Sequence, residues 1–267
     1  MKIKVAGKSH IGMKRKLNED SYLIRHDLGL YVVADGMGGH RAGEVASRMV
    51  IESMTDYWQK VNINEAPSMS ESLKKDLSGI AKHLVNSLSF ANTIVHEAQK
   101  QPQYLRMGST VSALLVEGDL IWVANVGDSP VYILDQGHLR LISEEHSLEA
   151  EQKNMGFGDS FSSTNPLMKN MLTRVMGLYD TVEVFINPIR PDPGDIILVC
   201  SDGLTNYLPE NDIKEILDDS SMSLEQKIDQ LINGANRGGG GDNISVILLD
   251  IQEEGRWDRL KKRIKPG

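Results

Sequence analysis

An unbroken apolar run over residues 30–34 ends on Asp35, and three glycines follow at positions 36, 38 and 39. Valine-rich runs of this length before glycine are typical of a buried strand that leads into a tight turn. From Ala42 onward apolar residues return at helical spacing, which predicts a helix over residues 42–60. The pattern therefore places the Asp35 carboxylate at the tip of a core strand, beside glycines that let other groups approach closely.

Two other structures share parts of this pattern. Asp-Gly commonly forms the tip of a β-hairpin, but a helix follows here instead of a second strand. A dinucleotide-binding Gly-x-Gly-x-x-Gly turn also joins a strand to a helix, but Arg41 stands at its third glycine position. From this segment alone, a metal-binding aspartate and a structural turn both remain open.

The rest of the chain alternates between short apolar runs and amphipathic segments. We expect strands over residues 2–11, 21–26, 110–116, 120–126, 131–134, 138–141, 182–186, 195–200 and 243–249, and helices over 69–100, 209–218 and 224–236. Short turns separate the strands between residues 110 and 141, which predicts an antiparallel meander. Residues 62–70 should form a surface loop. The pattern is lost over residues 146–172, where we expect a long loop after a short helix, and such loops often act as lids.

Composition limits the function classes. The chain has 267 residues, 40% hydrophobic content and a net charge of −8, which excludes wholesale disorder and argues against nucleic-acid binding. No apolar run reaches membrane-spanning length, and residues 1–5 do not resemble a signal peptide. The single cysteine, Cys200, leaves no internal disulfide and favours a reducing compartment, so we expect a cytoplasmic protein. Without an internal repeat or a clear linker, residues 1–267 are expected to form one domain.

The pattern at Asp35 recurs elsewhere. An apolar run ends at Asp202-Gly203, another ends at Gly127-Asp128, and Asp242 comes directly before the last expected strand. If that strand is antiparallel to the others, its start lies at the sheet edge where they end. The four aspartates are then expected to converge, with Glu19 and Asp20 as further candidates.

Such a group of acids has a specific chemical consequence. Carboxylates packed together repel one another and raise each other's pKa values, and hard divalent cations relieve that repulsion. Ligands that are all oxygens favour Mg²⁺ or Mn²⁺ over Zn²⁺. Shared carboxylates suggest two metals about 3.5–4 Å apart that hold an activated water. Any one of these aspartates alone could still be an ordinary turn residue.

Short motifs in a fixed order extend this pattern across nearly the whole chain. They are Arg15-x-x-Asn18-Glu19-Asp20, Asp35-Gly36-Met37-Gly38-Gly39-His40, Gly108-Ser109-Thr110, Asn125-Val126-Gly127-Asp128-Ser129, Glu145-His146-Ser147, Leu172-Thr173-Arg174, Ser201-Asp202-Gly203-Leu204 and Asp242-Asn243. Together they resemble the metal-dependent protein phosphatases, the type 2C serine/threonine class, in its bacterial form. The resemblance implies an α+β fold, a four-layer α/β/β/α sandwich of two antiparallel sheets flanked by helices, with metals at one end.

The resemblance also implies roles for individual residues. It implies that Asp35 bridges two Mn²⁺ or Mg²⁺ ions and that the Gly36 carbonyl binds one of them. The other implied ligands are Asp202 and Asp242 on the first metal, Glu19 through water on the second with Asp20 in support, and Asp128 with Asp202 on a third. Arg15 resembles the phosphate clamp, for which its planar fork is suited. The implied reaction is direct attack of a metal-bound hydroxide on phosphoserine or phosphothreonine.

Some positions depart from the family pattern. Pro130 replaces the usual arginine after Gly-Asp-Ser, and Met37 replaces the histidine of the animal members. We interpret His40 and His146 as structural, and Cys200 as a core thiol because the arginine of cysteine phosphatases is missing. The basic tail (about residues 254–267) is expected to form a docked or frayed terminal helix, or to contact an acidic partner or a membrane surface.

The sequence thus predicts a monomeric phosphatase of phosphoserine and phosphothreonine proteins that opposes a protein kinase. The alternative is a catalytically weak, phosphoprotein-binding regulatory relative. Retention of Arg15 and of every expected metal carboxylate argues against this alternative.

Overall fold

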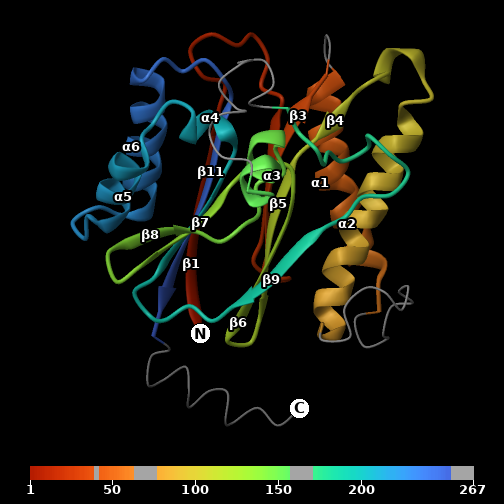
Figure 1. Cartoon of the computed structure of the whole chain (residues 1–267). Coiled ribbons are helices and arrows are strands. Elements are labelled where there is room, and N and C mark those ends of the chain that lie inside the picture. Colours follow the sequence, from red (N-terminus) through yellow and green to blue (C-terminus); the bar gives the residue numbers. More distant parts are fainter. Residues whose placement is uncertain (39–41, 63–76, 157–170, 254–267) are drawn as a thin grey trace.

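The structure, a computed structural model, describes residues 1–38, 42–62, 77–156 and 171–253. In these residues two antiparallel sheets pack face to face between two layers of helices (Figure 1). The first sheet has the order β1 (Lys2–His10), β11 (Ile244–Gln252), β10 (Ile196–Cys200), β7 (Val131–Asp135) and β8 (His138–Leu141). The second has the order β2 (Asp20–Arg25), β3 (Leu30–Met37), β5 (Val111–Glu117), β6 (Leu120–Val126) and β9 (Phe185–Ile189), and the short β4 (Gly108–Ser109) pairs with β3.

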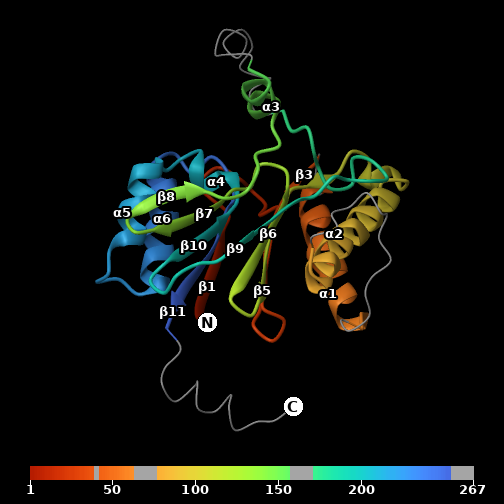
Figure 2. The same cartoon turned by 60° about the horizontal axis from the view of Figure 1, so that its bottom comes forward.

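Helices cover the outer face of each sheet. On the second sheet lie α1 (Ala42–Lys60) and α2 (Gly79–Ala98), and on the first lie α4 (Asp202–Thr205), α5 (Glu210–Asp218) and α6 (Leu224–Arg237) (Figure 2). A 3₁₀ turn, η1 (Pro102–Tyr104), follows α2, and α3 (Leu148–Asn154) stands away from the sandwich. The predicted four-layer α+β sandwich is confirmed. No helix in the described ranges is both long and apolar enough to cross a membrane.

The apolar run at residues 30–34 is continuous because β3 is buried on both faces. Tyr31 and Val33 face the first sheet, and they share a core there with Val199. Leu30 and Val32 point the other way, into the core beneath α1 and α2. Each such buried side chain contributes about 1.5–3 kcal/mol. A strand covered on both faces has no polar side to show, so its sequence does not alternate.

Three sequence predictions need correction. The strand does not end at Asp35, because β3 continues to Met37 and its last two residues pair with β4. The predicted meander is wrong, because β5 and β6 form a hairpin in the second sheet whereas β7 and β8 form one in the first. The segment around Asp128 therefore crosses between sheets. Strand β9 lies three residues later than predicted, and Pro188 fits there because β9 is an edge strand.

The predicted antiparallel pairing of the last strand is confirmed. β11 pairs antiparallel to β10, with Cys200 opposite Val246. The residues after β10 and those before β11 therefore lie at the same end of the first sheet. In the second sheet Asp20 and Asp35 are cross-strand partners on β2 and β3.

Several predictions fall outside the described residues. These are the loop over 62–70 apart from Asn62, the helix before residue 77, the structural role of His40, most of the loop over 146–172, and the basic tail after residue 253. The short helix predicted at the start of that loop is present as α3.

Candidate metal centre

Three aspartates from distant parts of the chain share one buried site. Asp35 lies near the end of β3, Asp20 lies beside it on β2, and Asp202 begins α4. Burial raises the pKa of Asp35 well above its usual range, and the nearby carboxylates of Asp20, Asp202 and Asp242 raise it further. The structure therefore brings together the acids of both sheets at one end of the sandwich.

The neighbouring carboxyl groups respond in the same way. Burial raises the pKa of Asp20 to about 7, although hydrogen bonds from Ser201 and Ser245 oppose the change. The pKa of Asp202 is raised by burial and then by Asp242. Asp128 also reaches a pKa of about 7, through burial and then through Asp202. These carboxyl groups cannot all carry charge in this site unless a cation offsets their repulsion.

The predicted phosphate clamp lies at the edge of this group. Arg15 Nη2 donates to Asp242 Oδ2 at 2.7 Å, and Arg15 Nη1 lies 3.5 Å from Glu19 Oε2. Burial raises the pKa of Glu19 although Arg15 opposes the change. A cation therefore already sits on two of the predicted ligands, which shows that their arrangement accepts positive charge.

The Gly36 carbonyl and the Glu19 carboxylate converge at the start of α1. A Cβ atom added to Gly43 would lie 2.4 Å from Glu19 Oε1 and 2.7 Å from the Gly36 oxygen. A Cβ atom added to Gly36 would lie 2.0 Å from the Gly43 oxygen. Only glycine fits at either position, so these glycines allow a carbonyl and a carboxylate to face the same point.

Two oxygens in the site have no hydrogen-bond partner although they are buried. They are Asp20 Oδ1 and Asp202 Oδ1. An unpaired buried carboxylate oxygen is costly, and a hard cation is the partner that an oxygen-only donor set would bind. The residues present therefore fit Mn²⁺ or Mg²⁺.

In the described residues, the side chains of the predicted ligands are not arranged as a complete metal coordination sphere. In the described part of the chain, no three acidic, histidine or cysteine residues have the arrangement of a metal-ligand cluster. Arg15 forms ion pairs with two of the predicted ligands, with Asp242 at 2.7 Å and with Glu19 at 3.5 Å. Metal binding would require these two carboxylates to exchange Arg15 for the ion.

A buried histidine holds the turn that carries Asp128. The ring atom Nδ1 of His146 accepts a hydrogen bond from the backbone N–H of Gly127 at 3.0 Å. The backbone N–H of His146 donates to the Gly127 carbonyl at 3.1 Å. Burial, followed by the charge of Arg174, lowers the pKa of His146 to about 4. A neutral ring is needed for Nδ1 to accept, so the predicted structural role of His146 is confirmed. Cys200 is fully buried in the core under α4–α6, which confirms the core thiol.

Sequence reasoning missed the residues that hold the aspartates in place. Ser109 Oγ donates to the Asp35 carbonyl at 3.0 Å, and the Asp35 N–H donates to Thr110 Oγ1 at 3.2 Å. Ser201 Oγ donates to Asp20 Oδ2 at 2.7 Å. Asn243 donates to two backbone carbonyls and accepts from the Glu19 N–H. Ser201 and Asn243 each adjoin an expected ligand in the sequence, which was the available signal, whereas the motif of Ser109 and Thr110 contains no expected ligand.

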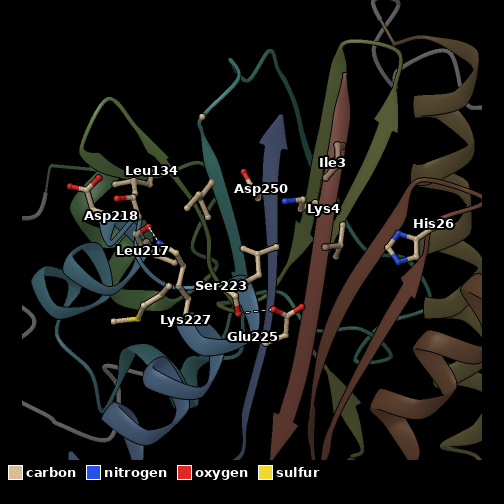
Figure 3. A pocket seen from close by; sticks show the side chains of 16 residues that line it. Ile3, Lys4, His26, Leu134, Leu217, Asp218, Ser223, Glu225, Lys227 and Asp250 are labelled. Carbon is tan, nitrogen blue, oxygen red and sulfur yellow. Dashed lines mark hydrogen bonds between the residues drawn. The ribbon is translucent and has the colours of Figure 1, made fainter. Parts of the chain in front are cut away.

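A cavity of about 860 Å³ lies elsewhere and does not coincide with these carboxylates. It is bounded by the first residues of β1 and β10, the last residues of β7 and β11, and the loop between α5 and α6 (Figure 3). Asp202 and Asp242 lie at the opposite ends of β10 and β11. Lys4 and Asp250, which line the cavity, are cross-strand partners of opposite charge. We assign the chemistry to the carboxylate end, where one buried oxygen of Asp20 and one of Asp202 lack a hydrogen-bond partner.

The chain is similar to known proteins in sequence and in fold. The family model described as protein phosphatase 2C matches residues 6–234. The serine/threonine phosphatase stp of Listeria welshimeri is 36% identical over 253 residues, which cover 92% of this chain and 95% of that protein. The serine/threonine phosphatase of S. agalactiae superposes with a TM-score of 0.82 at 32% identity, covering 94% of this chain and 100% of that one. The catalytic domain of the phosphatase PstP, solved with two manganese ions, gives a TM-score of 0.74 at 28% identity, over 94% and 99% of the two chains. With the family model spanning most of its length and these relatives nearly all of it, the chain belongs to the protein phosphatase 2C family.

Proposed function

We propose that the chain is a serine/threonine phosphoprotein phosphatase that depends on Mn²⁺ or Mg²⁺. The observation that carries this proposal is the buried group of Asp35, Asp20 and Asp202, with Arg15 at its edge. Acids that repel one another beside an arginine form a site for cations and for a phosphate that bridges them. The names of the relatives and the manganese ions of PstP support the same reading.

The predicted residues divide into two tasks. Asp35, Asp202, Asp242 and the Gly36 carbonyl would hold two ions, with Glu19 and Asp20 alongside, and Asp128 with Asp202 would hold a third. When bound, such ions neutralise charge and activate a water. Arg15 would bind the phosphate of the substrate through its two-nitrogen fork.

The two terminal nitrogens with which Arg15 would bind a phosphate now contact Asp242 and Glu19. The Arg15 side chain is almost half exposed, with 44% of its surface accessible, so it can move without unpacking a core. Once ions bind Asp242 and Glu19, the two acids no longer hold Arg15 as strongly. Loading the centre would therefore release the arginine for substrate.

Met37 leaves the reaction without a protein acid at that position. The residue pairs with Gly108 at the end of β3, and its thioether cannot donate a proton. We propose that water protonates the departing serine or threonine oxygen.

Phosphate release from a phosphothreonine peptide tests the function. We expect release with Mn²⁺ or Mg²⁺ and none with chelator. Release that is independent of metal, or no release with any metal, would contradict the proposal.

Other features stay as proposals drawn from the sequence. We propose that residues 1–267 form one phosphatase domain with a short basic tail (about residues 254–267), because each sheet combines strands from both halves of the chain. An opposing protein kinase, a monomeric state and a cytoplasmic location are expectations of the same kind.

A further inference from the structure

The loop that carries Arg15 is fastened to the segment that carries Asp242. In this arginine loop (residues 11–19), the N–H groups of Met13 and Lys14 both donate to the Gly240 carbonyl, at 2.8 and 3.2 Å. Asn243 Nδ2 donates to the carbonyls of Ile11 and Leu17, each at 2.9 Å. The position of Arg15 therefore depends on the glycine segment (residues 238–241) and on the two residues that follow it.

The glycine segment in turn lies against one aromatic side chain. A Cβ atom added to Gly241 would lie 2.0 Å from the hydroxyl oxygen of Tyr207 and 2.6 Å from its Cζ. One added to Gly239 would lie 3.3 Å from Tyr207 Cδ1, and one added to Gly238 would lie 1.9 Å from the Tyr207 carbonyl oxygen. The segment follows both the backbone and the ring of Tyr207 at distances that a side chain would prevent.

Tyr207 also belongs to the part of the chain that carries Asp202. Its N–H donates to the Leu204 carbonyl of α4 at 3.2 Å, and the preceding Asn206 donates to Asp202 Oδ2 at 2.9 Å. The half-buried ring packs against the core beneath α4–α6. Figure 1 shows α4 beside α6 and the end of the first sheet where β11 begins.

We propose that Tyr207 is a positioning residue whose ring supports the glycine segment and thereby sets Asp242 and Arg15 relative to Asp202. The inference rests on the proposed function, because it concerns the spacing between predicted metal ligands and the predicted phosphate clamp. The Tyr207 side chain, in contact with Gly241, fixes how closely the segment that carries Asp242 approaches the segment that carries Asp202.

A pair of substitutions tests this contact directly. Gly241 has no positive φ, so Gly241→Ala is tolerated by the backbone, and the three heavy atoms nearest to the added Cβ all belong to the Tyr207 side chain. We expect a loss on the order of 10²-fold in kcat/KM on a phosphothreonine peptide, since a misplacement of about 1 Å can cost that much. Tyr207→Leu keeps apolar bulk for the core but is too short to reach Gly241. The double variant should therefore lose no more than Tyr207→Leu alone and should recover part of the loss caused by Gly241→Ala.

Two further variants separate positioning from general destabilisation. Gly79→Ala is the matched control, because a Cβ atom there meets nothing within 4 Å, and its kinetics should equal those of the parent. Tyr207→Phe keeps the ring but loses the hydroxyl oxygen nearest Gly241, so its effect should fall between the parent and Tyr207→Leu, which alone should raise both KM and the Kd for Mn²⁺. Melting temperatures are recorded for every variant, and kinetics and calorimetry are run well below them.

The outcomes are decisive in both directions. Parent-like kinetics of Gly241→Ala, or a double variant no better than Gly241→Ala, overturns the proposal. If Gly241→Ala does not fold, the comparison of Tyr207→Leu with Tyr207→Phe decides, and equal Mn²⁺ affinity and KM in the two overturns it. If the parent releases no phosphate with Mn²⁺, the proposed function fails, while Mn²⁺ affinities of the same variants still test the positioning of Asp242.

Discussion

At the scale of single residues, Asp35 has the most strongly perturbed environment of the site. Its carboxyl group is surrounded by three other acids, so a bound cation is its natural partner. Loss of a residue that only supports a metal ligand typically lowers metal affinity roughly 10–100-fold. We expect Asp35→Asn, which changes a ligand itself, to lower Mn²⁺ affinity by more than this and to abolish most turnover. Calorimetric Mn²⁺ titration beside steady-state rates measures both effects. Asp202→Asn and Asp242→Asn should behave alike, and unchanged affinity in any of the three would remove that residue from the site.

Arg15 is predicted to contact the substrate and not the metal. Arg15→Lys keeps the charge but loses the two-nitrogen fork, so we expect kcat/KM on a phosphopeptide to fall about 10–100-fold, the value of one hydrogen bond to a charged group. Arg15→Ala should fall further, with Mn²⁺ affinity preserved or increased because Asp242 and Glu19 are freed. Steady-state kinetics and calorimetry check the split. Equal kinetics of the lysine variant and the parent would show that the fork plays no part.

At the scale of an element, the segment between β6 and β7 depends on His146. His146→Ala would leave the buried Gly127 N–H unpaired, which should lower the free energy of unfolding by about 1–3 kcal/mol at pH 7.5.

The pH dependence of that loss has a definite sign. The pKa of His146 is lowered to about 4 in the folded protein, against about 6.5 unfolded. The stabilisation is fully present above pH 6.5 and is lost as the pH falls toward 4, because the unfolded state takes up the proton first. The difference between parent and variant should therefore narrow toward pH 4. Chemical denaturation at several pH values measures the difference in free energy of unfolding between parent and variant. A difference that stays constant with pH would contradict a His146 ring that is neutral in the folded protein.

The elements themselves were largely predictable from the sequence, and the errors have physical causes. The run at residues 30–34 identified β3, because burial on both faces leaves a continuous apolar pattern. The meander was wrong because the turns at Asp128 and at Gly137 look alike locally, yet one changes sheets and the other makes a hairpin. Only the packing of the two sheets decides between them.

The candidate site was predictable for the aspartates and less so for what supports them. Asp202 and Asp242 could be paired once β11 was taken as antiparallel to β10, because this pairing fixes which ends meet. The contact between Tyr207 and Gly241 could not be derived, since nothing in a run of glycines says which side chain fills the space they leave.

At the scale of the whole molecule, the two sheets meet at an end filled with buried carboxyl groups, so stability and metal binding are coupled. In the metal-free protein the pKa values of Asp20 and Asp128 are raised to about 7, against about 3.9 unfolded. A carboxyl group with a raised pKa contributes stability that is present below its unfolded pKa and is lost as the pH rises through its folded pKa.

We therefore expect the melting temperature in chelator to fall between pH 6.5 and pH 8. In that window His146 is neutral in the folded protein and at most half protonated in the unfolded state, so its opposing slope is smaller than that of the two acids. Mn²⁺ binds the charged carboxylates, so at 100 times its Kd it should add about 2.7 kcal/mol per site and remove the fall. Asp128→Asn should flatten the slope in chelator, while Asp27→Asn, at an exposed surface ion pair, serves as the control. A metal-free melting temperature that rises between pH 6.5 and pH 8 would show that the pKa values of these acids are not raised in the folded protein.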